Sequence, residues 1–324
     1  MGTLILRRLL YSIPLLLLSS LILFWAIRTT DTFDPTARLA QSRDPETVSR
    51  ARENLGLNDP IMVQYGHWLG DFVTGDWGES QLSRDDVFGK TQTALWNTVQ
   101  LIFWGVLFSA SIAMAIGVYS AVKQYSLGDY FFTGLSYLGI AMPPFWFGLL
   151  AIHYLSVEPK TWFDLQEVPF KFIGLHSPGE SGVNWDYFAH LVLPVLTLTV
   201  QIVASWTRFQ RAAMLDVLSS DYIRTARAKG LPRRKVVVRH AVRNSLIPLV
   251  TVMAVDIGLL FGGLIITEVI FSIPGMGQLF YDSLLAGDGP VILAWMMVAG
   301  LFILLFNLLA DLLYGVLDPR VRVG

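Results

Sequence analysis

The chain has 324 residues, of which 53% are hydrophobic and only 15% charged, and its formal net charge at pH 7 is −1. A soluble chain would carry about a quarter charged residues. Here the apolar residues form long runs between polar stretches, the pattern of a multi-spanning helical membrane protein. The chain has no cysteine, which excludes disulfides, thiolate metal sites and cysteine nucleophiles. The net charge does not indicate a nucleic-acid partner.

The first predicted span directly follows the N-terminus. Arg7 and Arg8 precede an apolar run over residues 9–27. At ~1.5 Å per residue this run reaches ~28 Å, close to the ~30 Å thickness of the hydrocarbon core. A cleaved signal peptide has a shorter apolar core and a small-residue cleavage site. We therefore interpret residues 1–27 as an uncleaved N-terminal span.

Five further apolar runs complete an all-α integral membrane fold with six transmembrane helices, because backbone amides in lipid must be paired within their own segment. These spans are predicted over residues 97–122, 130–156, 188–209, 244–271 and 291–317. Pro143 and Pro144 should break the backbone hydrogen bonding of the third span and kink it.

The remaining segments are predicted to lie outside the bilayer. Residues 28–96 form an extracytoplasmic region that we expect to fold into short helices on the membrane surface. The five-span core over 97–317 carries two outer loops, 157–187 and 272–290, and the second has an amphipathic centre. Residues 210–243 form an inner loop, and residues 318–324 form a cytoplasmic tail.

The distribution of Lys and Arg predicts that both termini face the cytoplasm. With the N-terminus inside, the inner segments hold 15 of the 24 basic residues. The stretch from Arg208 to Arg243 alone holds ten basic and two acidic residues. An excess of Lys and Arg marks the cytoplasmic side of membrane proteins.

The inner loop contains a short helix followed by a sharp turn. Asp221 is a fair N-cap, good helix formers follow, and Gly230 is a stop signal. Pro232 lies in the turn, and helix signals resume from Arg233. A helix of about two turns is not stable alone in water. With the rest of the chain in lipid, we infer a soluble partner. The alternative is a basic loop lying on anionic headgroups.

This segment resembles the cytoplasmic signature loop of ABC importer permeases, whose general form is Glu-Ala-Ala, three residues, then Gly. Arg224, Thr225, Ala226 and Gly230 occupy those positions, and Ala226 and Gly230 match outright. The form YIRTARAKGL…RHAVRN.LIP is similar to that of the dipeptide, oligopeptide and nickel subgroup. Further agreeing strings are RENLGL.DP…QYG.WL (52–69), GD.G.S (75–80), MPPFW (142–146), TE.IF.IPGMG (267–277) and LDPR (317–320).

The resemblance implies a type I ABC importer permease that forms half of a translocation pathway and works by alternating access. It also implies a second homologous permease, two ATP-binding subunits or a fused one, and an extracytoplasmic substrate-binding protein. ATP and Mg would be held by those partner subunits, with no cofactor in this chain. It places the chain in a bacterial or archaeal cytoplasmic membrane. The implied ATPase-coupling helix comprises Ser219, Ser220, Asp221, Tyr222, Ile223, Arg224, Thr225, Ala226, Arg227, Ala228, Lys229, Gly230 and Leu231.

No catalytic or metal site is predicted. Gly89-Lys90-Thr91 is the only candidate for a phosphate-binding loop, but Arg84 stands where that loop needs Gly. The five His residues are scattered without paired ligand spacing.

Polar residues inside predicted spans are costly in lipid and usually face a cavity or a partner helix. We hypothesise that Asp256, with Gln201 and Ser205 of the fourth span, lines the substrate pathway and attracts an amino group or cation. Structural pairing of Asp256 with another helix is the alternative. Gly258 and Gly262 form a GxxxG pair, which predicts close packing against the second permease.

Glu268 lies near the outer end of the fifth predicted span. It is expected to tie down the outer loop rather than bind substrate.

Peptides are the predicted substrates, with nickel or glutathione as alternatives for the same architecture. Two functions of other classes are weighed against this one. A stand-alone secondary transporter would usually be larger and show an inverted repeat. An intramembrane hydrolase would need a catalytic pair, and no motif supports one.

Overall fold

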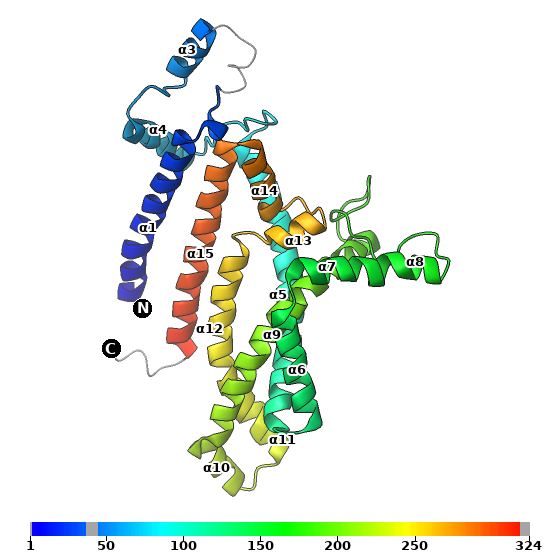
Figure 1. The fold of residues 1–324 in the computed structure, drawn as a ribbon. Coiled ribbons are helices and arrows are strands. Elements are labelled where there is room, and N and C mark those ends of the chain that lie inside the picture. The colour runs from blue at the N-terminus through cyan, green and yellow to red at the C-terminus, as the bar shows by residue number, and fades with distance from the viewer. Residues whose placement is uncertain (1, 37–44, 318–324) are drawn as a thin grey trace.

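The structure is a computed structural model that describes residues 2–36 and 45–317. The predicted tail, 318–324, and most of the LDPR string lie outside the described residues. Figure 1 shows the helices in chain order. The long helices are α1 (Gly2–Thr29), α5 (Val87–Val122), α9 (Trp185–Ser219), α12 (Arg243–Leu260) and α15 (Gly289–Leu317). The shorter ones are η1 (Asp31–Phe33), α3 (Pro45–Asn54), α4 (Ile61–Thr74), α6 (Leu127–Ala141), α7 (Pro144–Ile152), the π-helical η2 (His153–Val157), α8 (Glu158–Trp162), α10 (Asp221–Ala228), α11 (Arg233–Lys235), the π-helical η3 (Val236–Val242), α13 (Ile265–Ile270) and α14 (Met276–Ala286).

The prediction of an all-helical membrane fold is confirmed. Within the described residues, five helices are long and apolar enough to cross a bilayer, or up to six if one bent pair counts as a single span. Short helices α3 and α4 fold within the predicted 28–96 region. The second span begins at Val87, earlier than predicted, because polar residues extend α5 beyond its apolar run.

The third predicted span, 130–156, is wrong as a single helix. α6 and the α7–α8 segment are bent by 102° relative to each other, and α7 and α8 project sideways in Figure 1. Met142 has extended backbone angles at the break, because the residue before a proline avoids the helical region. Pro143 also lacks the amide hydrogen that would continue the helix. The predicted kink is therefore a complete break.

The fifth predicted span, 244–271, is also too long. α12 ends at Leu260, and α13 is a separate short helix. Gly263, with φ of 112°, lies between them, in a conformation that side chains other than glycine rarely adopt. The apolar run continued across this turn, so hydrophobicity alone did not reveal the helix end.

The centre of the molecule is the packed pair α5 and α9. Their contact uses a row of small buried residues on α5 at a spacing of four, Gly105, Ser109, Ala113 and Gly117. A Cβ atom at Gly117 would lie 2.7 Å from Cβ of Gln210 and 3.1 Å from the carbonyl oxygen of Thr207. Such rows let helix backbones approach closely in membranes.

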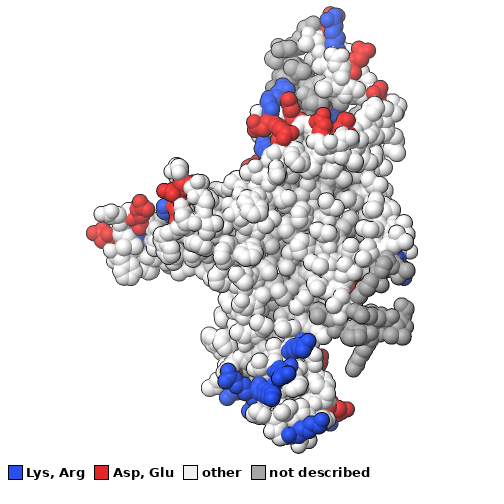
Figure 2. Space-filling model, turned by 180° about the vertical axis from the view of Figure 1, so that it is seen from behind, with Lys and Arg blue, Asp and Glu red and all other residues white. Residues whose placement is uncertain are grey.

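Charged residues divide between the two ends of the molecule. In Figure 2, Lys and Arg gather at the end formed by α10 and α11, while Asp and Glu gather at the opposite end and on the projecting arm. The exposed basic residues are Arg224, Arg227, Lys229, Arg233, Arg234, Lys235, Arg239 and Arg243. Exposed acids at the other end include Asp59, Asp71, Asp76, Glu79 and Asp85.

Candidate functional site

The predicted coupling segment contains the two-turn helix α10, Asp221–Ala228. Ser220, rather than Asp221, occupies the N-cap position, and its hydroxyl donates to the carbonyl oxygen of Val217 at 2.6 Å. At the other end, the amide of Lys229 donates to the carbonyl of Thr225 at 3.0 Å, and Gly230 adopts φ of 76°. This left-handed glycine ends the helix as predicted.

The inference that α10 needs a soluble partner for its stability is wrong. Ile223 is fully buried and Ala226 is 9% exposed. Both pack in a hydrophobic cluster with Ala121 of α5, Met214 of α9 and Val236 of η3. The ends of α5 and α9 nearest α10 extend beyond their apolar runs and supply this surface. The helix is thus held by its own chain, and a partner is not required to fold it.

The opposite face of α10 is available for contact. Its exposed residues are Asp221, Tyr222, Arg224, Thr225, Arg227, Ala228 and Lys229. Tyr222 accepts a hydrogen bond on its hydroxyl from Asn244 Nδ2 at 2.9 Å, and Arg233 Nη2 donates to the carbonyl of Val122 at 3.3 Å. These bonds link both sides of the turn to α12 and α5. The exposed face of α10 is therefore attached to the long helices at both sides of the turn.

A buried polar contact also joins α9 and α12, the two long helices connected by the α10–η3 segment. Gln210 of α9 donates its amide to Ser245 Oγ of α12 at 2.9 Å, and that hydroxyl donates to the carbonyl of Val242 at 3.0 Å. Gln210 and Ser245 are both fully buried. This bond joins α9 to α12 and satisfies the amide nitrogen of Gln210, whose buried Oε1 has no hydrogen-bond partner among the described residues.

Asp256 has a partner that sequence inspection missed. Trp206 of α9 is 1% exposed, and its indole Nε1 donates to Asp256 Oδ2 at 2.7 Å. Asp256 itself is half-buried. Trp and Asp at this separation in the chain have no sequence signature as a pair. The contact is the structural pairing weighed as the alternative, and among the described residues the second carboxylate oxygen accepts no hydrogen bond.

The three predicted pathway residues do not form one cluster. Ser205 lines a groove between α6 and α9 that does not include Asp256 or Gln201. The side-chain nitrogen of Gln201 is buried without a hydrogen-bond partner among the described residues. A pathway through Asp256 and one through Ser205 would run along different sides of α9.

Gly258 packs against its own chain. A Cβ atom there would lie 2.8 Å from Cβ of Phe306 and 3.5 Å from Cα of Ile303, both on α15. Gly262 lies in the turn after α12, where the nearest atom to a Cβ is the carbonyl oxygen of Leu259 at 3.2 Å. The close approach at Gly258 is thus explained by α15. The row on α5 at a spacing of four was the stronger small-residue signal.

Glu268 of α13 ties down the outer loop, as predicted. It is fully buried and accepts hydrogen bonds from Thr98 Oγ1 at 2.7 Å and from the amides of Gly277 and Gln278 at 2.6 and 3.0 Å. A Cβ at Gly275 would lie 2.5 Å from Glu268 Cδ. The glycines of the IPGMG string therefore make room for this carboxylate at the start of α14.

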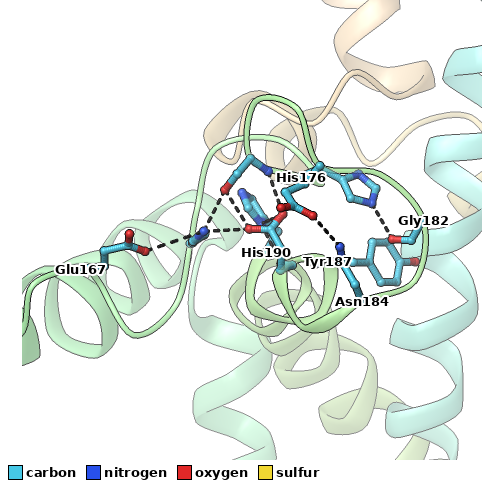
Figure 3. Close-up of polar contacts among 10 residues, drawn as sticks. Glu167, His176, Gly182, Asn184, Tyr187 and His190 are labelled. Atoms are coloured by element: carbon cyan, nitrogen blue, oxygen red, sulfur yellow. Dashed lines mark hydrogen bonds and ion pairs between the residues drawn. The ribbon is translucent and has the colours of Figure 1, made fainter.

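The 157–187 loop is anchored on the start of α9 by a polar network (Figure 3). Lys171 Nζ donates to Asp186 Oδ1 at 2.7 Å and to Ser177 Oγ at 2.8 Å, and the hydroxyl of Ser177 donates to Asp186 Oδ1 at 2.7 Å. The hydrogen bond to Asp186 raises the pKa of Lys171. A serine–lysine hydrolase needs a neutral lysine as base, so this pair suits anchoring rather than catalysis.

Comparison with known proteins places these features in a family. The family described as binding-protein-dependent transport system inner membrane component matches residues 113–323, and its N-terminal region matches residues 1–103. The chain belongs to this family.

Curated relatives match over almost their whole length. The chain is 38% identical to the oligopeptide transport system permease protein AppB of Bacillus subtilis, over 99% of this chain and 100% of the relative. It is 36% identical to the dipeptide transport system permease protein DppB and 35% identical to the glutathione transport system permease protein GsiC, both of Escherichia coli strain K12, over 98% of each chain.

Proposed function

We propose that this chain is a permease subunit of an ATP-driven importer of short peptides. The observation that carries the substrate class is the end-to-end similarity to permeases named for oligopeptides, dipeptides and glutathione. All three names denote molecules with peptide bonds. Nickel stays the alternative cargo that the subgroup resemblance allows.

The proposed partners follow from the family and from α10. A binding-protein-dependent system needs a substrate-binding protein outside and an energy source inside. ATP hydrolysis is assigned to two separate ATP-binding subunits or a fused one, and a second related permease completes the pathway. The exposed face of α10, held rigidly on the cluster of Ile223 and Ala226, is the proposed docking surface for an ATP-binding subunit.

The charge division supports an orientation with α10 in the cytoplasm. The exposed basic residues cluster around α10 and α11, and the acidic end carries α3 and α4 (Figure 2). Basic residues are retained on the cytoplasmic side. We place both termini on that side and the 28–96 region outside, facing the binding protein.

Asp256 is proposed to contribute to substrate passage. Its Oδ2 is held by Trp206, which orients the carboxylate. Oδ1 would then present negative charge to the amino group of a peptide. Of the other two predicted pathway residues, Ser205 lines the α6–α9 groove instead, and Gln201 is proposed to contribute polar surface on α9.

Reconstitution tests the proposal. The chain is purified with its second permease, ATP-binding subunits and binding protein, inserted in liposomes, and supplied with dipeptides, tripeptides, longer peptides, glutathione or Ni²⁺. ATP-dependent accumulation of peptides supports the proposal. Accumulation of Ni²⁺ but not of peptides would show that nickel is the substrate instead. Uptake by the chain without its ATP-binding subunits would refute the assignment as an ATP-driven importer.

A further inference from the structure

A groove between α6 and α9 lies outside the pathway proposed through Asp256. It has a volume of about 530 Å³ and is lined in part by Thr133, Ser136, Tyr137, Thr207 and Arg208. Small-molecule sites commonly measure ~300–1,000 Å³. The groove is therefore large enough for a ligand head group.

The groove lies at the depth of the phospholipid headgroups. Residues 188–207 of α9 contain no Asp, Glu, Lys or Arg, and at ~1.5 Å per residue they span the ~30 Å of hydrocarbon. Arg208 is the first charged residue after this run. With α10 in the cytoplasm, as the proposed function has it, Arg208 reaches the headgroup layer of the inner leaflet.

Arg211 has an acidic partner, whereas Arg208 does not have one among the described residues. Arg211 pairs with Asp129 through two hydrogen bonds of 2.9 Å, so its charge is already neutralised. Arg208 is exposed and lies with Cζ 5.2 Å from the ring centroid of Tyr137. In the part of the chain that the structure describes, it forms no ion pair. The stacked ring holds the guanidinium in place and leaves its donors free for an anion.

A buried hydroxyl in the same groove also lacks a partner. Thr207 is 3% exposed, and its Oγ1 has no hydrogen-bond partner among the described residues. A buried polar group without a partner is costly. This hydroxyl is enclosed by the protein, so the exposed guanidinium of Arg208 is the group that suits the oxygens of a phosphate, which accept charge-assisted hydrogen bonds.

The groove also has exposed aromatic walls. Tyr137 of α6 and Phe209 of α9 line it with side chains that are 57% and 48% exposed. Acyl chains attached to a bound phosphate would lie against these side chains. Free phosphate would gain nothing from them.

We propose that the α6–α9 groove binds the phosphate of an anionic phospholipid of the inner leaflet. Arg208 supplies the charge, and Tyr137 orients the guanidinium. Basic pockets between transmembrane helices on the cytoplasmic side bind such headgroups in other membrane proteins. The site rests on the proposed orientation but not on the identity of the transported substrate.

The test compares lipid retention in the complete transporter. Wild type, Arg208→Gln and the control Arg243→Gln are reconstituted in phosphatidylcholine vesicles with phosphatidylglycerol and extracted gently. Phosphatidylglycerol bound per complex is then measured by native mass spectrometry. Arg243 is an exposed arginine at the same end of the molecule, outside the groove. At about 1 kcal/mol per basic residue, Arg208→Gln should weaken binding about fivefold, and Arg243→Gln should not.

Further measurements distinguish a bound lipid from inorganic phosphate, transported peptide or the second permease at this groove. Arg208→Lys should retain part of the binding, and excess inorganic phosphate should not displace the lipid. Equal retention by Arg208→Gln and wild type would overturn the proposal, as would displacement by inorganic phosphate. A changed KM for peptide at unchanged lipid retention would assign Arg208 to the substrate instead, and loss of the second permease would assign it to an interface. Wild-type uptake, measured alongside, reports on the proposed function separately.

Discussion

Gly230 is required by the backbone and not by the space around it. Its φ is 76°, and a Cβ atom there would have no neighbour within 4 Å. Gly230→Ala should therefore destabilise the end of α10 by about 1 kcal/mol. We expect a lower thermal midpoint of the purified transporter in detergent.

Gly70→Ala is the matched control for this effect. Gly70 lies inside α4 with ordinary helical angles, and its Cβ position is also open. Alanine is better than glycine inside a helix by up to about 1 kcal/mol, so this substitution should leave the midpoint unchanged or raise it. Equal effects of the two substitutions would contradict the assignment of left-handed geometry to Gly230.

Asp256 and Trp206 can be separated by mutation. Asp256→Asn removes the charge but keeps an oxygen that accepts from the Trp206 indole, whereas Trp206→Phe removes the donor and keeps the charge. If Asp256 attracts the amino group of a peptide, Asp256→Asn should reduce ATP-dependent uptake by the larger factor, with assembly intact. If Trp206→Phe is the more damaging and Asp256→Asn has no effect, the carboxylate is only structural.

Sequence reasoning at this scale succeeded where one residue determines its own conformation. Gly230 and Pro143 act through their own backbones, and both were predicted. The partners of Asp256 and Gly258 were not, because Trp206 and Phe306 lie about 50 residues from them in the chain. Such pairs follow from helix packing, which a single sequence does not encode locally.

At the scale of elements, Glu268 holds α13 and α14 against α5. Glu268→Ala would leave the hydroxyl of Thr98 and the amides of Gly277 and Gln278 without their acceptor. Each unsatisfied buried donor costs about 1–3 kcal/mol, so the thermal midpoint should fall clearly. Glu268→Gln keeps one acceptor oxygen and should give an intermediate loss. An unchanged midpoint for Glu268→Ala would mean that these bonds do not hold the outer loop.

The elements themselves were predictable to different degrees. Apolar runs located the long helices because lipid demands both hydrophobicity and length. The ends were less accurate, since α5 and α9 continue as helices beyond the apolar core. The break after Leu260 was missed because the residues across the turn, FGGLII (261–266), continue the apolar run of the span. The short length of α10 was predicted, but its support by Ile223 was not.

At the scale of the whole molecule, the charge division predicts which end faces the cytoplasm. The chain has no native cysteine, so single introduced cysteines report unambiguously. In intact cells, a membrane-impermeant maleimide should label Val73→Cys on α4, which is 76% exposed. It should label Ala228→Cys on α10 only after permeabilisation. The reverse pattern would invert the proposed orientation.

The most direct measurement for the central claim is crosslinking from the exposed face of α10. Ala228→Cys is exposed on that face and can carry a photoreactive crosslinker in the assembled transporter, with Val73→Cys as the control at the opposite end. The account predicts that Ala228→Cys captures an ATP-binding subunit and that Val73→Cys does not. Capture of lipid alone from Ala228→Cys would contradict it.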